Sequence, residues 1–338
     1  MAGFNARTGL EELEEYAVEH VAADIIVNAN ESNYNLPRPI EQAVAAKLAG
    51  FPFNRYPPMQ AETLRGLIAE DLALDADNIR IGNGSSELLQ MACYAFGGNG
   101  RKIAFPYPSF SMYGVYTKLA DSIAAPYPLT LTGYVDPDKV IEFCRAEQPA
   151  LLIVCNPNNP TGNNLSRDRL YKVLNTFQGI VVIDEAYIDF SIEPSFLGEL
   201  DKFPNLIVLQ TMSKAWGAAG IRLGMAFASP EIIAILNKIK YPYNVNLLTQ
   251  ERALYILENK ARMESQLRSI LSERIRLQAA LPGLNCVRKI YPTDANFILV
   301  EVTGVDTIYK NLVKQGIIVR NRTNVTMCNG CLRITVGK

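Results

Sequence analysis

The 338-residue sequence predicts an α/β protein with a large three-layer α/β/α domain around a mostly parallel sheet, and a smaller α+β domain. Between about residues 60 and 230, apolar runs of strand length alternate with stretches of helical period. Several of these runs are apolar throughout, which is typical of parallel strands buried on both faces. The length fits about two domains at roughly 150 residues each.

The strands expected in the large domain follow one another along the chain: 79–81, 102–105, 151–155, 180–184, 206–210 and 223–228. After Pro242, residues 246–280 keep a helical apolar spacing with no proline, which predicts one long, bent helix linking the domains. Short strands expected at 296–302, 317–319 and 332–336 belong to the smaller domain. We therefore expect a large domain at 50–255 and a small domain formed by 1–49 with 256–338.

Charge and cysteine usage limit the class of protein further. Lys and Arg number 33 against 34 Asp and Glu, a net charge of −1 that gives no footprint for nucleic acid or an anionic membrane. Six cysteines are few for this length and three lie in apolar runs, which favours reduced thiols in the cytoplasm. Cys328 and Cys331 have the spacing of a redox or zinc pair, but no second pair accompanies them, so we expect no metal. The single histidine, His20, argues against a Ser-His-Asp triad.

Lys214 is the strongest candidate for chemistry. It lies just after the expected strand 206–210, on the side where open α/β sheets bind ligands. A lysine among small residues there can bond an aldehyde cofactor, and Ser213 with Arg222 can hold a phosphate. Pyridoxal phosphate needs both groups. Taken alone, Lys214 would more often be a solvated loop lysine, and the other segments overturn that interpretation.

Asp184 ends a second buried strand and should emerge at the same sheet edge. A carboxylate against a pyridine nitrogen keeps that nitrogen protonated, which makes the ring an electron sink. Tyr187 and Asn159 could then bond the ring oxygen of the same cofactor. The Asn159 segment, 156–162, would also suit an ordinary turn, but it directly follows strand 151–155.

Two further segments complete the candidate site. The glycine-rich run 82–87 joins a short strand to a helix that begins near Ser86, where free N–H groups can bind phosphate. Ser85 could instead be a plain helix cap. Phe110 follows another expected strand and could stack on the pyridine ring, although an aromatic side chain alone is more often part of the core.

These segments together resemble the fold type I pyridoxal-phosphate aminotransferases and, within them, the histidinol-phosphate aminotransferase family. The resemblance runs from about Asn28 to Lys338. Its specific matches are Asn54-Arg55-Tyr56-Pro57, 156–162, Asp184-Glu185-Ala186-Tyr187, Ser213-Lys214 with Arg222, 243–246, Ala295-Asn296-Phe297 and 332–337. The resemblance implies a homodimer in which Tyr56 reaches the cofactor phosphate of the neighbouring subunit.

The resemblance also implies a role for each candidate. Lys214 would bond the cofactor, Asp184 would pair with its pyridine nitrogen, Tyr187 and Asn159 would bind its ring oxygen, and Ser85, Ser86, Ser213 and Arg222 would hold its phosphate. Phe110 would stack on the ring where the family usually has tyrosine. Arg320, Arg333 and, with a less clear alignment, Tyr16 would bind the substrate.

The implied reaction is amino transfer: the substrate amine displaces Lys214, which then moves a proton between substrate and cofactor. Family resemblance alone gives the substrates as L-histidinol phosphate and 2-oxoglutarate, in histidine biosynthesis. An aromatic aminotransferase for phenylalanine or tyrosine is the nearest alternative. A pyridoxal-phosphate decarboxylase of phosphorylated amino acids and a non-catalytic, cofactor-binding regulatory module are the others.

Overall fold

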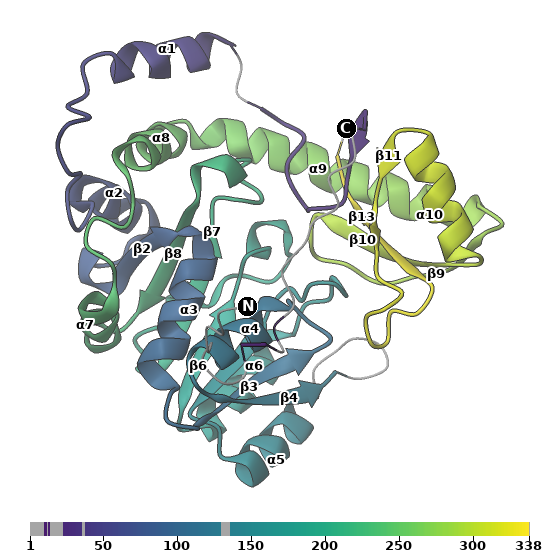
Figure 1. The fold of residues 1–338 in the computed structure, drawn as a ribbon, viewed down its shortest axis with the longest axis horizontal. Helices are drawn as coiled ribbons and strands as arrows, with labels where there is room; N and C mark the ends of the chain where they lie inside the picture. The colour runs from purple at the N-terminus through teal and green to yellow at the C-terminus, as the bar shows by residue number, and fades with distance from the viewer. Residues whose placement is uncertain (1–9, 12, 14–22, 36–37, 130–135, 338) are drawn as a thin grey trace, which may run out of the picture.

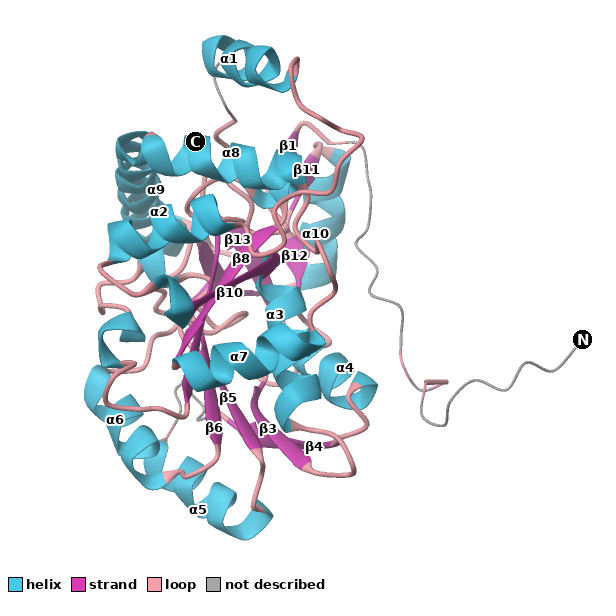
Figure 2. Ribbon diagram, turned by 90° about the vertical axis from the view of Figure 1, so that its left-hand side faces the viewer, coloured by secondary structure: helices cyan, strands magenta, loops and turns pink. Residues whose placement is uncertain are grey.

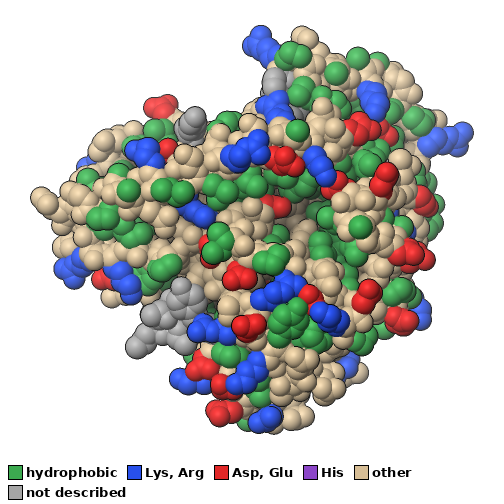
Figure 3. Space-filling view, turned by 180° about the vertical axis from the view of Figure 1, so that it is seen from behind, with side chains coloured by type: hydrophobic (Ala, Val, Ile, Leu, Met, Phe, Trp, Pro, Cys, Tyr) green, Lys and Arg blue, Asp and Glu red, His purple; other side chains and the backbone are tan. Residues whose placement is uncertain are grey.

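The computed structural model describes residues 10–11, 13, 23–35, 38–129 and 136–337. Tyr16 and His20 lie outside the described residues. Within them, the strands form a seven-stranded sheet, a four-stranded sheet and a two-stranded pair (Figure 1). No helix in these ranges is long and apolar enough to cross a membrane. On the face seen in Figure 3, acidic and basic side chains are interspersed.

The seven-stranded sheet has the order β2-β8-β7-β6-β5-β3-β4. Its strands are β2 (Ile79–Asn83), β3 (Lys102–Tyr107), β4 (Ile123–Pro128), β5 (Leu151–Cys155), β6 (Ile180–Asp184), β7 (Leu206–Thr211) and β8 (Leu223–Ala228). Strand β8 is antiparallel to both of its neighbours, and the pairs from β7 to β4 are parallel. The prediction of a mostly parallel sheet is therefore confirmed.

Side chains that point alternately to the two faces of the large sheet divide the interior into two cores. In β5, Leu152 and Val154 pack into one hydrophobic cluster, while Leu151, Ile153 and Cys155 pack into the other. The same period of two operates in β6 and β7, because successive side chains of a strand point to opposite faces. Burial on both faces explains why these strands are apolar throughout.

The α-helices in the described residues are α1 (Arg38–Leu48), α2 (Glu62–Leu72), α3 (Gly84–Phe96), α4 (Met112–Leu119), α5 (Pro137–Glu147), α6 (Arg167–Thr176), α7 (Pro230–Ile239), α8 (Leu247–Glu258), α9 (Lys260–Ala280) and α10 (Val305–Lys314). Helices α3, α4 and α7 contribute to one core, and α2, α5, α6 and α8 to the other. Figure 2 shows α3, α4 and α7 on one side of the strands and α5 and α6 on the other. This is the predicted three-layer arrangement.

The four-stranded sheet is antiparallel and has the order β12-β13-β10-β9. Its strands are β9 (Val287–Ile290), β10 (Phe297–Val302), β12 (Arg320–Asn321) and β13 (Cys331–Thr335). Helices α9 and α10 pack on it through a third hydrophobic cluster. Near the start of the described chain, β1 (Ile25–Ile26) pairs in parallel with β11 (Ile317–Ile318). The N-terminal segment is thereby joined to the C-terminal part of the chain.

The structure differs from the expected elements at α8–α9 and at β4. The single long helix expected at 246–280 is wrong, because α8 and α9 are separate helices that meet at Asn259 (φ −115°, ψ 30°). The Asn259 side chain donates to the Tyr255 carbonyl at 2.8 Å, and apolar spacing continues across the break. Strand β4 is not among the expected strands; it contains Pro126 and Pro128, and it lies at the sheet edge, where proline is tolerated.

Candidate active site

The candidate residues meet where the parallel strands of the large sheet end. Asp184 is the last residue of β6, and Ser213 and Lys214 follow β7. The 156–162 segment follows β5, and α3 begins directly after β2. Strands that run in parallel end at one sheet edge, so four loops converge there, as crevices in open α/β sheets require.

Asp184 is buried and holds two hydrogen bonds. Its Oδ2 accepts from the Tyr113 hydroxyl at 2.8 Å, and its Oδ1 accepts from the Ala186 N–H at 3.2 Å. Burial raises the pKa of the Asp184 carboxyl, and the Tyr113 bond, the Ala186 N–H and the Lys214 charge act against that rise. Sequence reasoning missed Tyr113, which lies 71 residues from Asp184 on α4.

The second carboxylate of the same motif has a different place. Glu185 accepts hydrogen bonds from Ser195 Oγ at 2.5 Å, from the Phe196 N–H at 2.8 Å and from Gln210 Nε2 at 2.9 Å. Burial raises the pKa of Glu185 to about 7 despite these bonds. Glu185 thus anchors the loop after β6, and Asp184 is the carboxylate at the candidate site.

Lys214 lies on a turn that the end of β7 fixes. Thr211 Oγ1 accepts the Ser213 N–H at 3.1 Å, and the Gly217 N–H bonds the Lys214 carbonyl at 3.1 Å. The Lys214 amine donates to the Ala29 carbonyl at 3.1 Å and lies 5.8 Å from the centre of the Tyr187 ring. Burial, followed by the charge of Arg333, lowers the pKa of Lys214 to about 8.

A cradle of backbone and polar side chains forms where α3 approaches Arg222. The Gly84 N–H donates to the Arg222 carbonyl at 2.8 Å, and a Cβ on Gly84 would collide with Arg222 Nη2. Gly224 is equally constrained, since its Cβ would collide with the Ser85 nitrogen. Glycine at both positions therefore permits the close approach of helix and strand.

The cradle brings together the four residues expected to hold a phosphate. Ser85 and Ser86 lie in the first turn of α3, and Arg222 Nη1 donates to Ser213 Oγ at 3.3 Å. The side chain of Asn83, which precedes the helix, makes no capping hydrogen bond to the α3 N-terminus. Helix N–H groups, hydroxyls and a guanidinium suit a phosphate dianion, so the residues present fit the phosphate of pyridoxal phosphate.

Arg333 is buried and connects three segments. Its Nη1 donates to Asn159 Oδ1 at 2.5 Å, and its Nη2 donates to the Asn28 carbonyl at 2.6 Å. Its guanidinium lies 5.3 Å from the centre of the Phe297 ring. Strand β13 thus delivers an arginine to the end of β5. Arg320 lies directly opposite Arg333 in the register of β12 and β13.

Tyr187 receives a hydrogen bond that the sequence did not indicate. Asn30 Nδ2 donates to the Tyr187 hydroxyl oxygen at 2.9 Å, and both side chains are buried. Burial raises the pKa of Tyr187 to about 12, and Arg333 opposes that rise. The Asn28–Asn30 segment belonged to the family resemblance, but nothing local in the sequence assigns it these partners.

The remaining candidates lie at different distances from this cluster. The Phe110 ring packs edge-on against Tyr113, with centroids 5.6 Å apart, next to the partner of Asp184. Tyr56 is 79% exposed and stacks on Tyr243 at 4.4 Å, so this chain alone does not bring it to the cradle. Tyr16 lies outside the described residues.

Cys328 and Cys331 pack against Leu299 and Tyr291, and burial raises their pKa values to about 11 and about 12. Both are free thiols. The described part of the chain holds no group of three or more His, Cys, Asp or Glu residues that could bind a metal ion.

With this geometry established, comparison with known proteins gives the family. The model of the family "Aminotransferase class I and II" matches residues 24–338, and the chain belongs to this family. It is 48% identical over 319 residues to a histidinol-phosphate aminotransferase from Parabacteroides distasonis, covering 94% of this chain and 88% of that one. It is 43% identical over 317 residues to a histidinol-phosphate aminotransferase from Bacteroides fragilis strain YCH46, with coverage of 94% and 87%.

The fold is also that of a solved relative. A histidinol-phosphate aminotransferase from Sinorhizobium meliloti in complex with pyridoxal-5'-phosphate superposes with a TM-score of 0.88 at 21% identity. The match covers 100% of this chain and 94% of that one. The expected fold class is therefore confirmed.

Proposed function

We propose that this chain is a pyridoxal-phosphate-dependent aminotransferase that acts on L-histidinol phosphate and 2-oxoglutarate in L-histidine biosynthesis. The observation that carries the proposal is the meeting of Lys214, Asp184 and the Arg222 cradle at one sheet edge. The activity named for relatives that match over most of the chain supports the substrate.

When bound, pyridoxal phosphate supplies an aldehyde for amines and a ring that withdraws electrons from the substrate carbon. Ser85, Ser86, Ser213 and Arg222 would hold its phosphate in the cradle. Asp184 would hold a proton at the pyridine nitrogen, because a buried carboxylate is stabilised by a cation beside it. Tyr187 and Asn159 would bond the ring oxygen, and Phe110 would cover a ring face.

Lys214 would move the proton at the substrate carbon. A general base works best when its pKa lies near the operating pH, and burial with the Arg333 charge lowers the pKa of Lys214 to about 8. The amine can therefore be neutral to take the proton and charged to return it. The Lys214 Nζ donates a hydrogen bond to the Ala29 carbonyl at 3.1 Å, and this bond orients the Lys214 side chain.

Arg333 and Arg320 would bind the anionic groups of the two substrates. A guanidinium forms paired hydrogen bonds with either phosphate or carboxylate, so one pocket can take L-histidinol phosphate and then 2-oxoglutarate. The register that places Arg320 opposite Arg333 supports a shared role. The same chemistry would accept an aromatic amino acid through its carboxylate, so substrate choice needs a direct test.

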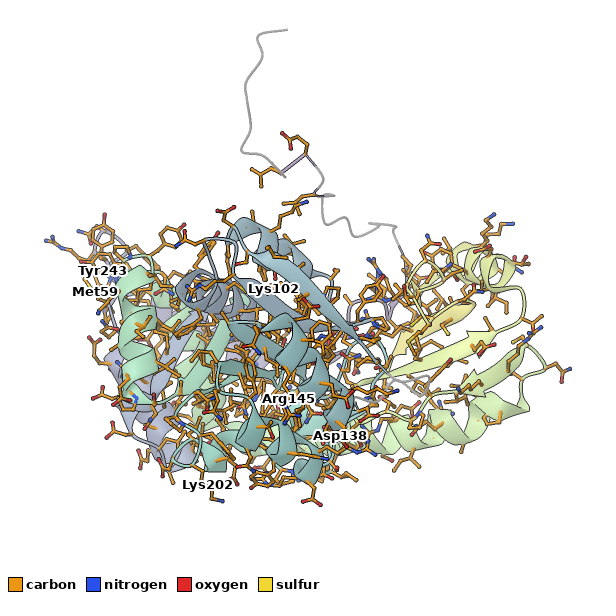
Figure 4. The ribbon with its side chains drawn as sticks, turned by 90° about the horizontal axis from the view of Figure 1, so that it is seen from below. Met59, Lys102, Asp138, Arg145, Lys202 and Tyr243 are labelled. Carbon is orange, nitrogen blue, oxygen red and sulfur yellow. The ribbon has the colours of Figure 1, made fainter. Side chains whose placement is uncertain are left out.

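We also propose a homodimer in which Tyr56 reaches the cradle of the second copy. Phe53, Tyr56, Met59 and Tyr241 expose between 45% and 79% of their surface, and Tyr243 stacks on Tyr56. Figure 4 shows Met59 and Tyr243 together at the end of the molecule away from the four-stranded sheet. An exposed apolar cluster of this kind favours contact with another protein surface.

The domain division and the location complete the proposal. We assign 50–255 to a large domain and 1–49 with 256–338 to a small domain, supported by the pairing of β1 with β11. All six cysteines are free, which supports the reducing environment of the cytoplasm.

The test is a single-turnover absorption experiment on the cofactor-loaded protein, mixed separately with L-histidinol phosphate, L-phenylalanine and a phosphorylated amino acid. We expect rapid conversion of the cofactor to its amine form with L-histidinol phosphate, followed by absorption, and the reverse conversion with 2-oxoglutarate. The Lys214→Ala variant is the control and should show neither conversion.

The other outcomes distinguish the alternatives. Faster conversion with L-phenylalanine would overturn the substrate and make the chain an aromatic aminotransferase. Release of carbon dioxide without amino transfer would make it a decarboxylase. Binding of the cofactor without any turnover would favour a regulatory module.

A further inference from the structure

We propose that Asn30 is a positioning residue that fixes which way the Tyr187 hydroxyl donates its proton. The Asn30 amide donates to the Tyr187 oxygen, so the proton of Tyr187 is left for the ring oxygen of the cofactor. The inference rests on the proposed function, because that function gives the Tyr187 hydroxyl an acceptor. Asn30 itself would touch neither substrate nor cofactor and would act through Tyr187.

The other end of the Asn30 amide is bonded to Thr335. The Asn30 backbone N–H donates to Thr335 Oγ1 at 3.0 Å, and that hydroxyl donates to Asn30 Oδ1 at 3.2 Å. A hydroxyl has one proton, and Thr335 uses it on the amide oxygen. With the amide oxygen bonded to Thr335, the amide nitrogen faces Tyr187, 2.9 Å away.

The backbone at Asn30 also holds the side chain in place. Asn30 has φ 56°, a left-handed conformation that asparagine adopts more readily than most residues. Its carbonyl accepts from Asn296 Nδ2 at 3.0 Å. Asn30 is 1% exposed, so bulk water has little access to these bonds. A buried amide that is bonded through both its nitrogen and its oxygen is a rigid reference for a hydroxyl that could otherwise rotate.

The surrounding charges agree with a donating Tyr187. Arg333 lowers the pKa of the Tyr187 hydroxyl, Cys155 and Asp184 raise it, and the Lys214 amine lies 5.8 Å from the centre of the ring. Burial raises the pKa of Tyr187 to about 12, so the phenol keeps its proton at neutral pH. A phenol that accepts an N–H becomes a stronger donor through its own O–H, because linked hydrogen bonds polarise one another.

The test uses the pH midpoint at which the visible absorption of the bound cofactor changes, rather than turnover. A hydrogen bond donated to the ring oxygen stabilises its negative charge and so lowers this midpoint. Asn30→Asp keeps the shape and the left-handed preference but replaces a donor by an acceptor. Tyr187 must then donate to the introduced carboxylate, and we expect the midpoint to rise by roughly one pH unit, about the rise caused by Tyr187→Phe.

A double-variant cycle separates hydrogen-bond direction from charge. The aspartate charge alone also raises the midpoint, and that part is measured by adding Asn30→Asp to Tyr187→Phe. We expect this second rise to be well below the rise in the wild-type background. Equal rises in the two backgrounds would overturn the proposal, since the effect would then be charge alone.

Asn30→Gly covers the case in which the aspartate variant does not fold, because glycine accepts φ 56° and only removes the amide. We expect a midpoint between those of the wild type and Tyr187→Phe, and a wild-type midpoint would overturn the proposal. Failure of the proposed function is recognised separately: the wild type would then show no visible band that disappears in Lys214→Ala.

Discussion

The hydroxyl of Tyr113 donates to Asp184 Oδ2 at 2.8 Å, from the middle of the core between α4 and the end of β6. Tyr113 is 0% exposed and Asp184 is 6% exposed, so bulk water has little access to either side chain. A buried carboxylate without donors would take up a proton, and the Tyr113 bond opposes this. The Tyr113 bond thus favours the ionised carboxylate, which the proposed function needs.

Tyr113→Phe should shift the acid limb of activity to higher pH. Burial already raises the Asp184 pKa, and loss of the donor raises it further, so the carboxylate is ionised only at higher pH. A hydrogen bond to a charged group contributes about 1.5–3 kcal/mol, so we expect the acid limb to move up by roughly one to two pH units. The pH profile of kcat/KM measures the shift.

Tyr127→Phe is the matched control for that change. Tyr127 is also fully buried, but its hydroxyl donates to the Ile153 carbonyl at 2.8 Å, away from Asp184. It should cost stability and leave the acid limb in place. An unmoved acid limb in Tyr113→Phe would show that Tyr113 does not control the charge of Asp184.

The cofactor-free protein should take up pyridoxal phosphate through Lys214 with a pH midpoint near its pKa of about 8. The neutral amine is the nucleophile, so uptake quickens as the pH rises through this value. Arg333→Gln should raise the midpoint by removing a cation, and Asp184→Asn should lower it by removing an anion. Stopped-flow absorption measures the rates, and shifts of the same sign would contradict this account.

The same lysine gives a signed prediction for stability. A pKa lowered in the folded state means that folding disfavours the charged amine, so this contribution improves as the pH rises from about 8 towards 10.5. Lys214→Met should therefore stabilise the cofactor-free protein at pH 7 and lose that advantage above pH 10. Urea unfolding at the two pH values compares them, and an advantage independent of pH would contradict the prediction.

Arg80→Met should destabilise the fold by about 2–4 kcal/mol, because it removes a buried donor shared by three amide oxygens. Arg80 is 1% exposed and donates to Gln60 Oε1 at 2.8 Å, Asn237 Oδ1 at 3.1 Å and Asn244 Oδ1 at 2.9 Å. Urea unfolding measures the loss. Arg276→Met, which breaks the pair of an exposed arginine with Glu273, is the matched control and should change stability little.

If Tyr56 acts on the second copy, Tyr56→Ala and Lys214→Ala should complement each other. Each variant alone should have little activity. A mixed dimer would contain one site with both Lys214 and the Tyr56 of the other copy, and random mixing should restore about a quarter of wild-type activity. Co-expression followed by an activity assay measures this, and no recovery in a confirmed mixed dimer would contradict the proposed exchange.

The local pattern of apolar residues was sufficient to predict most strands of the large sheet. Strands β5, β6 and β8 have the predicted bounds, because runs of apolar residues are what a strand buried on both faces requires. Pattern was insufficient where position in the sheet mattered. The prolines of β4 are acceptable only because it is an edge strand. At Asn259 helix α8 ends although the apolar spacing of the sequence continues past this residue.

The sequence by itself determined the fold class and the candidates Lys214, Asp184 and Arg222, because strand ends and glycine-rich turns are local features of the chain. Only the tertiary structure decided their partners. Tyr113 reaches Asp184 across 71 residues, and Arg333 and Thr335 reach the Asn28–Asn30 segment across 305. Such pairs depend on how distant elements pack. The residues next to a hydrogen-bonding side chain in the sequence do not indicate which distant partner packing will bring to it.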